Sequence, residues 1–211
     1  MSFLQNNQTV LFQGDSVTDA GRTFTNPQGL GFGYPAIIAE TIHYQYPSLH
    51  VSFINRGISG NRVRDLVSRW DKDCISLSPN IVIILIGIND TWRRFDSNDP
   101  TSAIRFEEEY RSIILKTLQS TKAHIILMSP FLLPINAERM TWREDVHEKI
   151  EVVEKLSNEF KIPYIPLHSI FDDLAENSNE PVSYWAGDGV HPTYAGHDII
   201  ANELLKLLIQ N

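Results

Sequence analysis

Short apolar segments alternate with amphipathic segments along the chain. Five of them are almost continuously apolar and rich in β-branched residues, at 9–14, 50–56, 80–87, 124–130 and 162–168. Strands of a parallel sheet that is covered on both faces have this composition, because both faces exclude water. The pattern therefore predicts five strands of a parallel sheet.

Helical periodicity fills most of the intervals between these strands. Apolar residues recur every three or four positions from Val63 to Cys74, from Val146 to Phe160 and from Ile199 to Leu208, and less regularly over 34–46 and 103–120. Alternation of strands and helices predicts βαβ units with right-handed crossovers and a three-layer α/β/α sandwich. We interpret segments 26–35, 90–100 and 131–145 as loops, the first as the most mobile because glycine and proline are frequent in it.

Length and composition indicate one ordinary globular domain over residues 1–211. The chain has 211 residues, of which 42% are hydrophobic and 21% charged, and no repeat or linker divides it. Its net charge of -8 opposes the neutralisation of phosphates, so nucleic acids and anionic membranes are not expected as partners. The N-terminus lacks the charged and apolar regions of a signal peptide, and a single cysteine, Cys74, excludes an internal disulfide. We expect a cytoplasmic protein in which Cys74 is a buried core thiol.

Three predicted strands are each followed by a residue that could take part in catalysis. Ser16 follows the first strand in Gly14-Asp15-Ser16, Gly57 follows the second, and Asn89 follows the third. In a flavodoxin-like sheet of order 2-1-3-4-5 these three strands are neighbours, and ligands bind at their carboxyl ends. The serine is then a candidate nucleophile. The N–H groups of Ser16 and Gly57 and the side-chain amide of Asn89 are candidate donors to the oxyanion of an acyl-transfer reaction.

A candidate base lies near the C-terminus, in the segment WAGDGVHPTYAGH. Asp188 precedes His191 by three residues in a glycine-rich loop, so its carboxylate can accept the Nδ1 proton and leave Nε2 to take the serine proton. Each motif alone also suits an ordinary turn. Asp188 and His191 could also, with His197, form half of a metal site, but no third ligand has a recognisable spacing, and no metal is predicted.

Taken together, the motifs resemble those of the SGNH hydrolases, also called GDSL-type esterases. The resemblance rests on GDSVTD for Ser16, NRGISGN for Gly57, GIND for Asn89 and DGVHPT for Asp188 and His191, which span residues 14 to 193. The strings GISGNRVRDL, IGINDTWRRFD and HPTYAGH are similar to a branch of intracellular acetyl esterases that act on xylo-oligosaccharides and related sugars. That resemblance implies a small acyl pocket and a homo-oligomer.

Aromatic side chains near these motifs are candidate substrate-binding residues. We assign this role to Trp92, Tyr184 and Trp185, with core packing or a subunit contact as the alternative. Asp15 is counted with them, although Asp15 and Asp19 are interpreted first as acids that hold the turn through backbone N–H groups. Positions expected to be structural or solvated are His43, His124, His147, His168, Arg93 and Arg94.

The sequence therefore predicts a cofactor-free serine esterase that hydrolyses short-chain esters through an acyl-enzyme, with O-acetyl groups on carbohydrates as the expected substrate. One alternative keeps the triad and changes the substrate to lysophospholipids or thioesters. The other is a non-catalytic, flavodoxin-like module that binds a nucleotide or phosphate, although no phosphate-binding glycine motif supports it.

Overall fold

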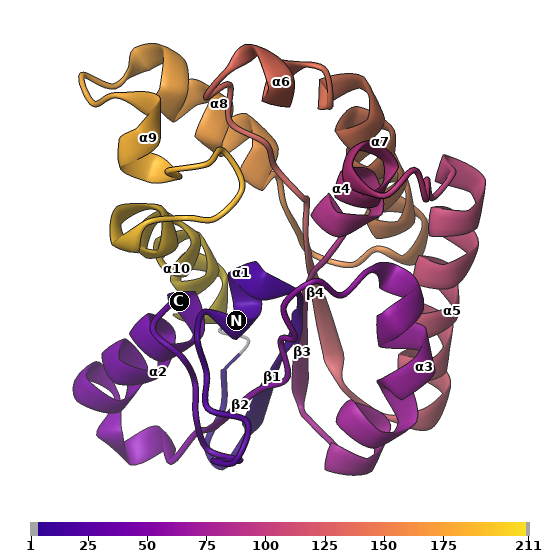
Figure 1. Cartoon of the computed structure of the whole chain (residues 1–211). Helices are drawn as coiled ribbons and strands as arrows, with labels where there is room; N and C mark the ends of the chain where they lie inside the picture. The colour runs from indigo at the N-terminus through magenta and orange to yellow at the C-terminus, as the bar shows by residue number, and fades with distance from the viewer. Residues whose placement is uncertain (1–3, 210–211) are drawn as a thin grey trace.

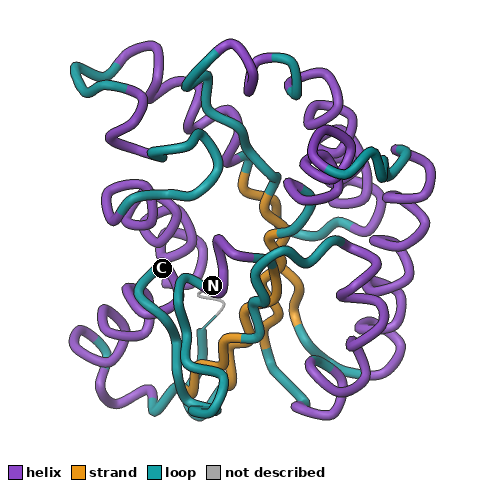
Figure 2. Tube along the Cα trace, viewed as in Figure 1, coloured by secondary structure: helices purple, strands orange, loops and turns teal. Residues whose placement is uncertain are grey.

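A five-stranded parallel sheet forms the centre of the molecule. The computed structural model describes residues 4–209 and places the strands in the order β2-β1-β3-β4-β5, with every neighbouring pair parallel. The strands are β1 (Thr9–Gly14), β2 (Ser52–Asn55), β3 (Ile81–Leu85), β4 (His124–Met128) and β5 (Tyr164–Ile165). The predicted order 2-1-3-4-5 is confirmed, and Figure 2 shows the strands as one twisted sheet with helices on both sides.

Two helical layers cover the sheet, as Figure 1 shows. One layer contains α2 (Tyr34–Gln45), α8 (Leu167–Asn177) and α10 (Tyr194–Ile209), and the other contains α3 (Val63–Asp73), α5 (Ala103–Ser120) and α7 (Arg143–Phe160). Successive side chains of β1 point to opposite layers: Val10 and Phe12 join one apolar cluster and Leu11 joins the other. Continuous apolarity of the strands follows from this two-sided burial, and the predicted three-layer sandwich is confirmed.

Several helices were not predicted. They are α1 (Ser16–Asp19), α4 (Ile88–Asp96), α6 (Ala137–Met140), α8 and α9 (Val182–Trp185), with two 3-10 turns, η1 (Pro47–Leu49) and η2 (Ile75–Leu77). The interpretation of 90–100 and 131–145 as loops throughout was therefore wrong. Helix α4 buries its first turn, from Ile88 to Thr91, and its apolar residues Ile88, Trp92 and Phe95 form a short stripe whose two aromatic rings pack on Trp142. Cys74 is a core thiol, as predicted, and burial raises its pKa to about 12.

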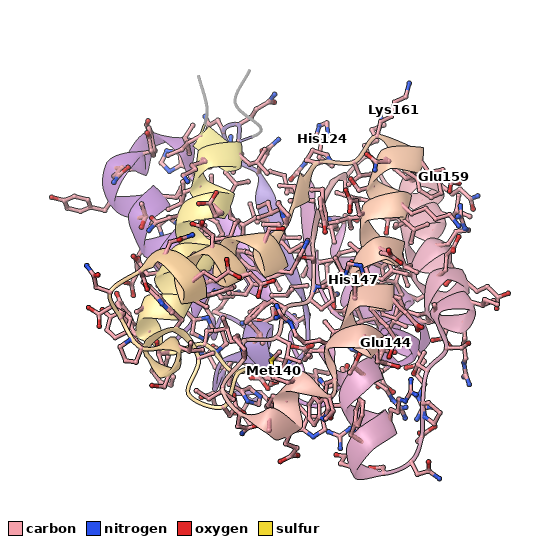
Figure 3. The ribbon with its side chains drawn as sticks, turned by 90° about the horizontal axis from the view of Figure 1, so that it is seen from above. His124, Met140, Glu144, His147, Glu159 and Lys161 are labelled. Carbon is pink, nitrogen blue, oxygen red and sulfur yellow. The ribbon has the colours of Figure 1, made fainter. Side chains whose placement is uncertain are left out.

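The two ends of the sandwich differ. His124, the first residue of β4, and Lys161 lie at one end, whereas Met140 and Glu144 lie towards the other (Figure 3). Since the strands are parallel, the second end holds their carboxyl termini, where ligands bind in such sheets. None of the helices within residues 4–209 is long and apolar enough to cross a membrane.

Candidate active site

Ser16 begins the short helix α1 directly after β1. Asp15 caps this helix, because its Oδ1 accepts the N–H of Val17 at 3.0 Å. The N–H of Ser16 belongs to the first turn, where backbone donors have no intrahelical acceptor. The turn therefore presents a half-buried hydroxyl together with a backbone N–H that has no protein acceptor among residues 4–209.

A continuous chain of hydrogen bonds joins Ser16 to the loop before α10. Ser16 Oγ lies 2.9 Å from His191 Nε2, and His191 Nδ1 lies 2.7 Å from Asp188 Oδ2. The other carboxylate oxygen, Oδ1, accepts the N–H groups of Val190 and His191 at 2.9 and 2.7 Å. The three predicted triad residues are thus brought together, and backbone donors fix the rotamer of the acid.

Asp188 and His191 shift each other's pKa so that both favour their charged forms. Burial opposes ionisation of Asp188, but hydrogen bonds from the His191 ring and from two backbone N–H groups outweigh it and hold its pKa well below the usual range. The hydrogen bond to Asp188 raises the pKa of His191, and burial only partly offsets this. Burial and the charge of His191 lower the pKa of the neighbouring His197 to about 4. His197 is therefore neutral at pH 7, and its Nδ1 accepts the N–H of Tyr34 at 3.3 Å.

Gly57 does not have the role that the sequence predicted for it. Its N–H donates to Asn55 Oδ1 at 2.8 Å, so this donor is already satisfied inside the loop. A Cβ at this position would lie 2.3 Å from the backbone nitrogen of Asp19. Glycine is required here because the loop after β2 packs directly on the backbone of α1, and the assignment of Gly57 to the oxyanion hole was wrong.

A free N–H that sequence reasoning missed lies at Gly60, three residues further on. Gly60 has φ +83° in a turn closed by the N–H of Asn61 and the carbonyl of Ile58, and a Cβ there would meet open space. Within residues 4–209 its own N–H has no protein acceptor. The signal was present, since the string NRGISGN contains two glycines and only the second ends a Ser-Gly turn.

Asn89 and Asp19 attach this turn to the serine. The buried Asn89 lies in the first turn of α4, and its Nδ2 donates one hydrogen to Asn61 O at 3.1 Å, which leaves its second amide hydrogen. Asp19 Oδ2 accepts the N–H and Oγ–H of Ser59 at 3.1 and 2.8 Å, and its Oδ1 accepts the N–H of Arg22 at 3.1 Å. The predicted role of Asp19 in holding the turn is confirmed.

An open crevice of about 430 Å³ lies at the hydroxyl of Ser16. Two of its lining residues are strongly exposed aromatics, Phe32 at 81% and Tyr194 at 72%. The remaining lining residues are Ser16, Val17, Ala20, His191, Pro192 and His197. Sequence reasoning missed both aromatics, because nothing in the strings GFGYP and HPTYAGH distinguishes an aromatic in an open loop from one in the core.

The candidate Trp92 lies against the triad. Its ring centre is 5.8 Å from that of His191 and 5.2 Å from that of the buried Trp142. The guanidinium of Arg139 stacks on both indoles, 3.9 Å from Trp142 and 4.5 Å from Trp92, and its Nε donates to Asp188 O at 3.1 Å. This stack supports the loop that carries the acid and the base.

Three other candidates are placed where they do not contact a substrate in this crevice. Asp15 and Trp185 are buried. The described lining of the crevice includes none of Asp15, Tyr184 and Trp185. The carbonyl oxygens of Tyr184 and Trp185 instead accept Oγ1–H and N–H of Thr193 at 2.5 and 2.9 Å, which anchors the loop of the triad. Burial raises the pKa of Asp15 to about 7, although the bond from Val17 and the charge of His191 oppose it.

The remaining predictions concern charged residues and metals. Arg93 pairs with Asp96 and Arg94 with Asp145, as expected for solvated arginines. Within residues 4–209 no group of three or more His, Cys, Asp or Glu side chains is arranged to hold a metal ion. The Nδ1 of His197 faces Tyr34, so it does not complete a site with Asp188.

A parallel α/β/α sandwich with a Ser-His-Asp chain at the carboxyl ends of its strands defines a hydrolase of the serine type. The chain belongs to the GDSL-like lipase/acylhydrolase family, whose model matches residues 12–199, and it is a carboxylic ester hydrolase. It is 36% identical over 207 residues to an acetylxylan esterase of Geobacillus stearothermophilus, covering 94% of this chain and 93% of that protein.

Solved structures agree with this assignment. The crystal structure of an acetylxylan esterase from Geobacillus stearothermophilus matches with a TM-score of 0.89 at 34% identity, covering 99% of this chain and 97% of that one. A protein of Parabacteroides merdae described as a GDSL-like lipase matches with a TM-score of 0.91 at 32% identity, covering 97% of both chains.

Proposed function

We propose that Ser16 is the nucleophile, His191 the general base and Asp188 the acid that orients it. The observation that carries this assignment is the chain of two short hydrogen bonds from Ser16 Oγ through the imidazole to Asp188. As Oγ attacks the ester carbonyl, its proton moves to Nε2. The imidazolium then protonates the departing alkoxide and leaves an acyl-enzyme, which water hydrolyses after giving its own proton to Nε2.

The negative oxygen of the tetrahedral intermediate needs donors that are already in place. We assign this role to the N–H groups of Ser16 and Gly60 and to the free amide hydrogen of Asn89, since each lacks a protein acceptor among the described residues. Donors held by a helix terminus, a closed turn and a buried side chain need no reorganisation during the reaction.

Removal of one of these donors is the direct test of the oxyanion hole. We expect Asn89→Ala to lower kcat by about 10²–10³ while KM changes little, because the donor acts on charge that exists only in the transition state. Steady-state kinetics with nitrophenyl acetate measure both constants. Asn202→Ala, an exposed asparagine on α10, is the matched control, and a change confined to KM would remove Asn89 from this role.

The finer proposal is that the ester is an O-acetyl group on an oligosaccharide such as acetylated xylan fragments. Support comes from the similarity to acetylxylan esterases and from the two exposed aromatics beside the triad. Structures of that esterase with alanine in place of a serine, an aspartate or a histidine are described as catalytic mutants, and its aspartate and histidine are three positions apart, as here. Acetate release from acetylated xylo-oligosaccharides tests the proposal.

Long-chain substrates fit the described surface less well. A lysophospholipase or a long-chain thioesterase needs an apolar channel for the acyl tail. The enclosed cavity beneath the serine turn, lined by Asp15, Val17 and Val190 among others, measures about 10 Å³, the space of one water molecule. Activity that rises from acetyl to octanoyl esters would favour the long-chain alternative. Homo-oligomerisation and a cytoplasmic location stay predictions.

Phe32 and Tyr194 are expected to hold the sugar. Replacing both with alanine should lower kcat/KM for acetylated xylo-oligosaccharides by about 10–100-fold, because each aromatic face that contacts a ligand contributes on the order of 1 kcal/mol. The rate with nitrophenyl acetate should change by less than about threefold. Tyr44→Ala removes an equally exposed aromatic, 87% accessible on α2, and is the matched control. Equal losses on both substrates would indicate damage to the triad and contradict sugar binding.

A further inference from the structure

A second groove, which takes no part in the mechanism described above, is lined by positively charged side chains. It has a volume of about 400 Å³ and three cationic side chains, Arg22, Arg56 and Lys72. The other lining residues are Phe24, Pro27, Ile58, Asp73 and Leu77. A concentration of cations is unexpected in a chain of net charge -8.

The cations of this groove lack carboxylate partners. Among residues 4–209, neither Arg56 nor Lys72 forms an ion pair, and the only side-chain bond of Arg56 goes to the carbonyl of Asn55. The one carboxylate that lines the groove, Asp73, pairs with another cation, Arg69, at 3.1 Å. The groove therefore carries an excess of positive charge.

Arg22 is the most informative of the three. Its residue is only 9% exposed, and its Nε donates to Gly57 O at 2.7 Å, yet its two terminal nitrogens have no protein acceptor within the described residues. Burial lowers its pKa; Asp19 and Asp73 oppose this effect, and the charge of Arg56 adds to it. Its terminal N–H groups are therefore free to form charge-assisted hydrogen bonds with a carboxylate that enters the groove.

The rest of the groove suits a sugar rather than a bare inorganic anion. Phe24 is 59% exposed, and the guanidinium of Arg22 lies 4.1 Å from its ring centre, which fixes an aromatic surface beside the positive charge. Proline, isoleucine and leucine line the same space. A volume of 400 Å³ is within the usual range for small organic ligands and exceeds what phosphate needs.

The groove is connected to the catalytic turn. Ile58, which lines it, donates its N–H to Gly14 O at 3.1 Å, two residues before Ser16. Arg22 holds Gly57 in the same loop, whose later residue Gly60 is assigned to the oxyanion hole. The loop after β2 therefore contributes both to this groove and to the surroundings of the catalytic serine.

We propose that the groove formed by Arg22, Arg56, Lys72 and Phe24 binds the carboxylate of a uronic acid unit in the acetylated oligosaccharide. The carboxylate contacts the cations, and the apolar face of the sugar packs on Phe24. This inference rests on the proposed function only for the identity of the oligosaccharide to which the uronic acid is attached, because binding of the uronic acid requires no catalysis.

The direct test measures binding of sodium glucuronate, glucose and inorganic phosphate to the full-length Ser16→Ala protein by calorimetry. We expect glucuronate to bind and glucose not to bind, and the additional Arg56→Gln/Lys72→Gln change to weaken glucuronate binding at least tenfold. Lys161→Gln is the matched control, since Lys161 points into solvent at the far end of α7 (Figure 3). Arg22 is left intact, because it supports Gly57.

Phe24→Ala separates a sugar from an inorganic anion. We expect it to weaken glucuronate binding several-fold without affecting phosphate. Phosphate binding as tightly as glucuronate, or glucuronate binding that ignores Phe24, would show a site for small anions and overturn the proposal. Absence of glucuronate binding would overturn it as well.

Kinetics separate this proposal from the proposed function. On acetylated oligosaccharides that carry a uronic acid, Arg56→Gln/Lys72→Gln should lower kcat/KM about tenfold, and on neutral ones it should have no effect. If neutral acetylated sugars are not cleaved while nitrophenyl acetate still is, the sugar deacetylase function fails, whereas the outcome of the binding experiment still decides the uronate site.

Discussion

Ser16→Ala should abolish nearly all esterase activity, with kcat for nitrophenyl acetate reduced by about 10⁴-fold or more. Without the hydroxyl no acyl-enzyme forms, and only the oxyanion donors and substrate binding remain. The fold should be unaffected, because Oγ makes its one side-chain hydrogen bond to His191 and the helix is capped by Asp15. Release of nitrophenol measures the rate, and unfolding in urea checks stability.

A second serine provides a sharp control. Ser169 Oγ lies 2.9 Å from His168 Nε2, the same distance as in the proposed Ser16-His191 pair. Ser169→Ala should keep full activity, and a fluorophosphonate should label the wild-type protein but not Ser16→Ala. Equal nitrophenol release by wild type and Ser16→Ala would end the assignment of the nucleophile.

Comparison of the two histidines explains why only one pair is reactive. The Nδ1 of His168 is bonded to the hydroxyl of Ser129 at 2.9 Å, not to a carboxylate, and burial lowers its pKa. His191 has a carboxylate at Nδ1, and the pKa of its ring is raised. A base that is to take a proton from serine needs the second arrangement, so proximity of serine and histidine alone is not sufficient.

Local patterns predicted what depends on local sequence. Five apolar segments predicted the strands, and their order was taken from the flavodoxin-like arrangement, which the structure has. The triad followed because Asp188 and His191 are close in sequence and Ser16 directly follows the first strand. Helix α4 was missed because its apolar stripe has only three residues, Ile88, Trp92 and Phe95, while Asn89, Asp90 and Thr91 are buried although they are polar. Hydrophobic periodicity gives a weak signal for a helix that is short and buries polar side chains.

Local sequence patterns could not predict features that depend on packing between segments distant in the sequence. The Ser-Gly turn distinguishes Gly60 from Gly57 only weakly in the sequence, and contact with α1 shows that Gly57 is a packing glycine whose N–H is occupied. Likewise, Phe32 and Tyr194 come from opposite ends of the chain and meet at the crevice only in three dimensions. Trp185, the last residue of α9, is buried in the apolar cluster that also holds residues of α8 and α10, which composition does not reveal.

The acid of the triad offers the other large effect, and the structure predicts its mechanism. In Asp188→Asn the side-chain oxygen should keep the position of Oδ1, because two backbone N–H groups donate to it. The new NH₂ group then faces His191 Nδ1, which must become an acceptor. The proton of the neutral ring moves to Nε2, and that nitrogen no longer accepts the proton of Ser16. We expect kcat to fall by about 10⁴-fold with the fold intact.

The pH profile distinguishes this explanation from simple loss of structure. The base must be neutral, so wild-type activity should rise with pH through the pKa of His191, which the hydrogen bond to Asp188 places above the ordinary histidine value. Asparagine removes that hydrogen bond and the negative charge, so the midpoint of the residual activity should move to lower pH. Asp198→Asn, an acid on α10 bonded to Asn202, should leave rate and midpoint unchanged. A variant at Asp188 that loses less than tenfold in kcat, or whose midpoint rises, would show that this carboxylate does not orient the base.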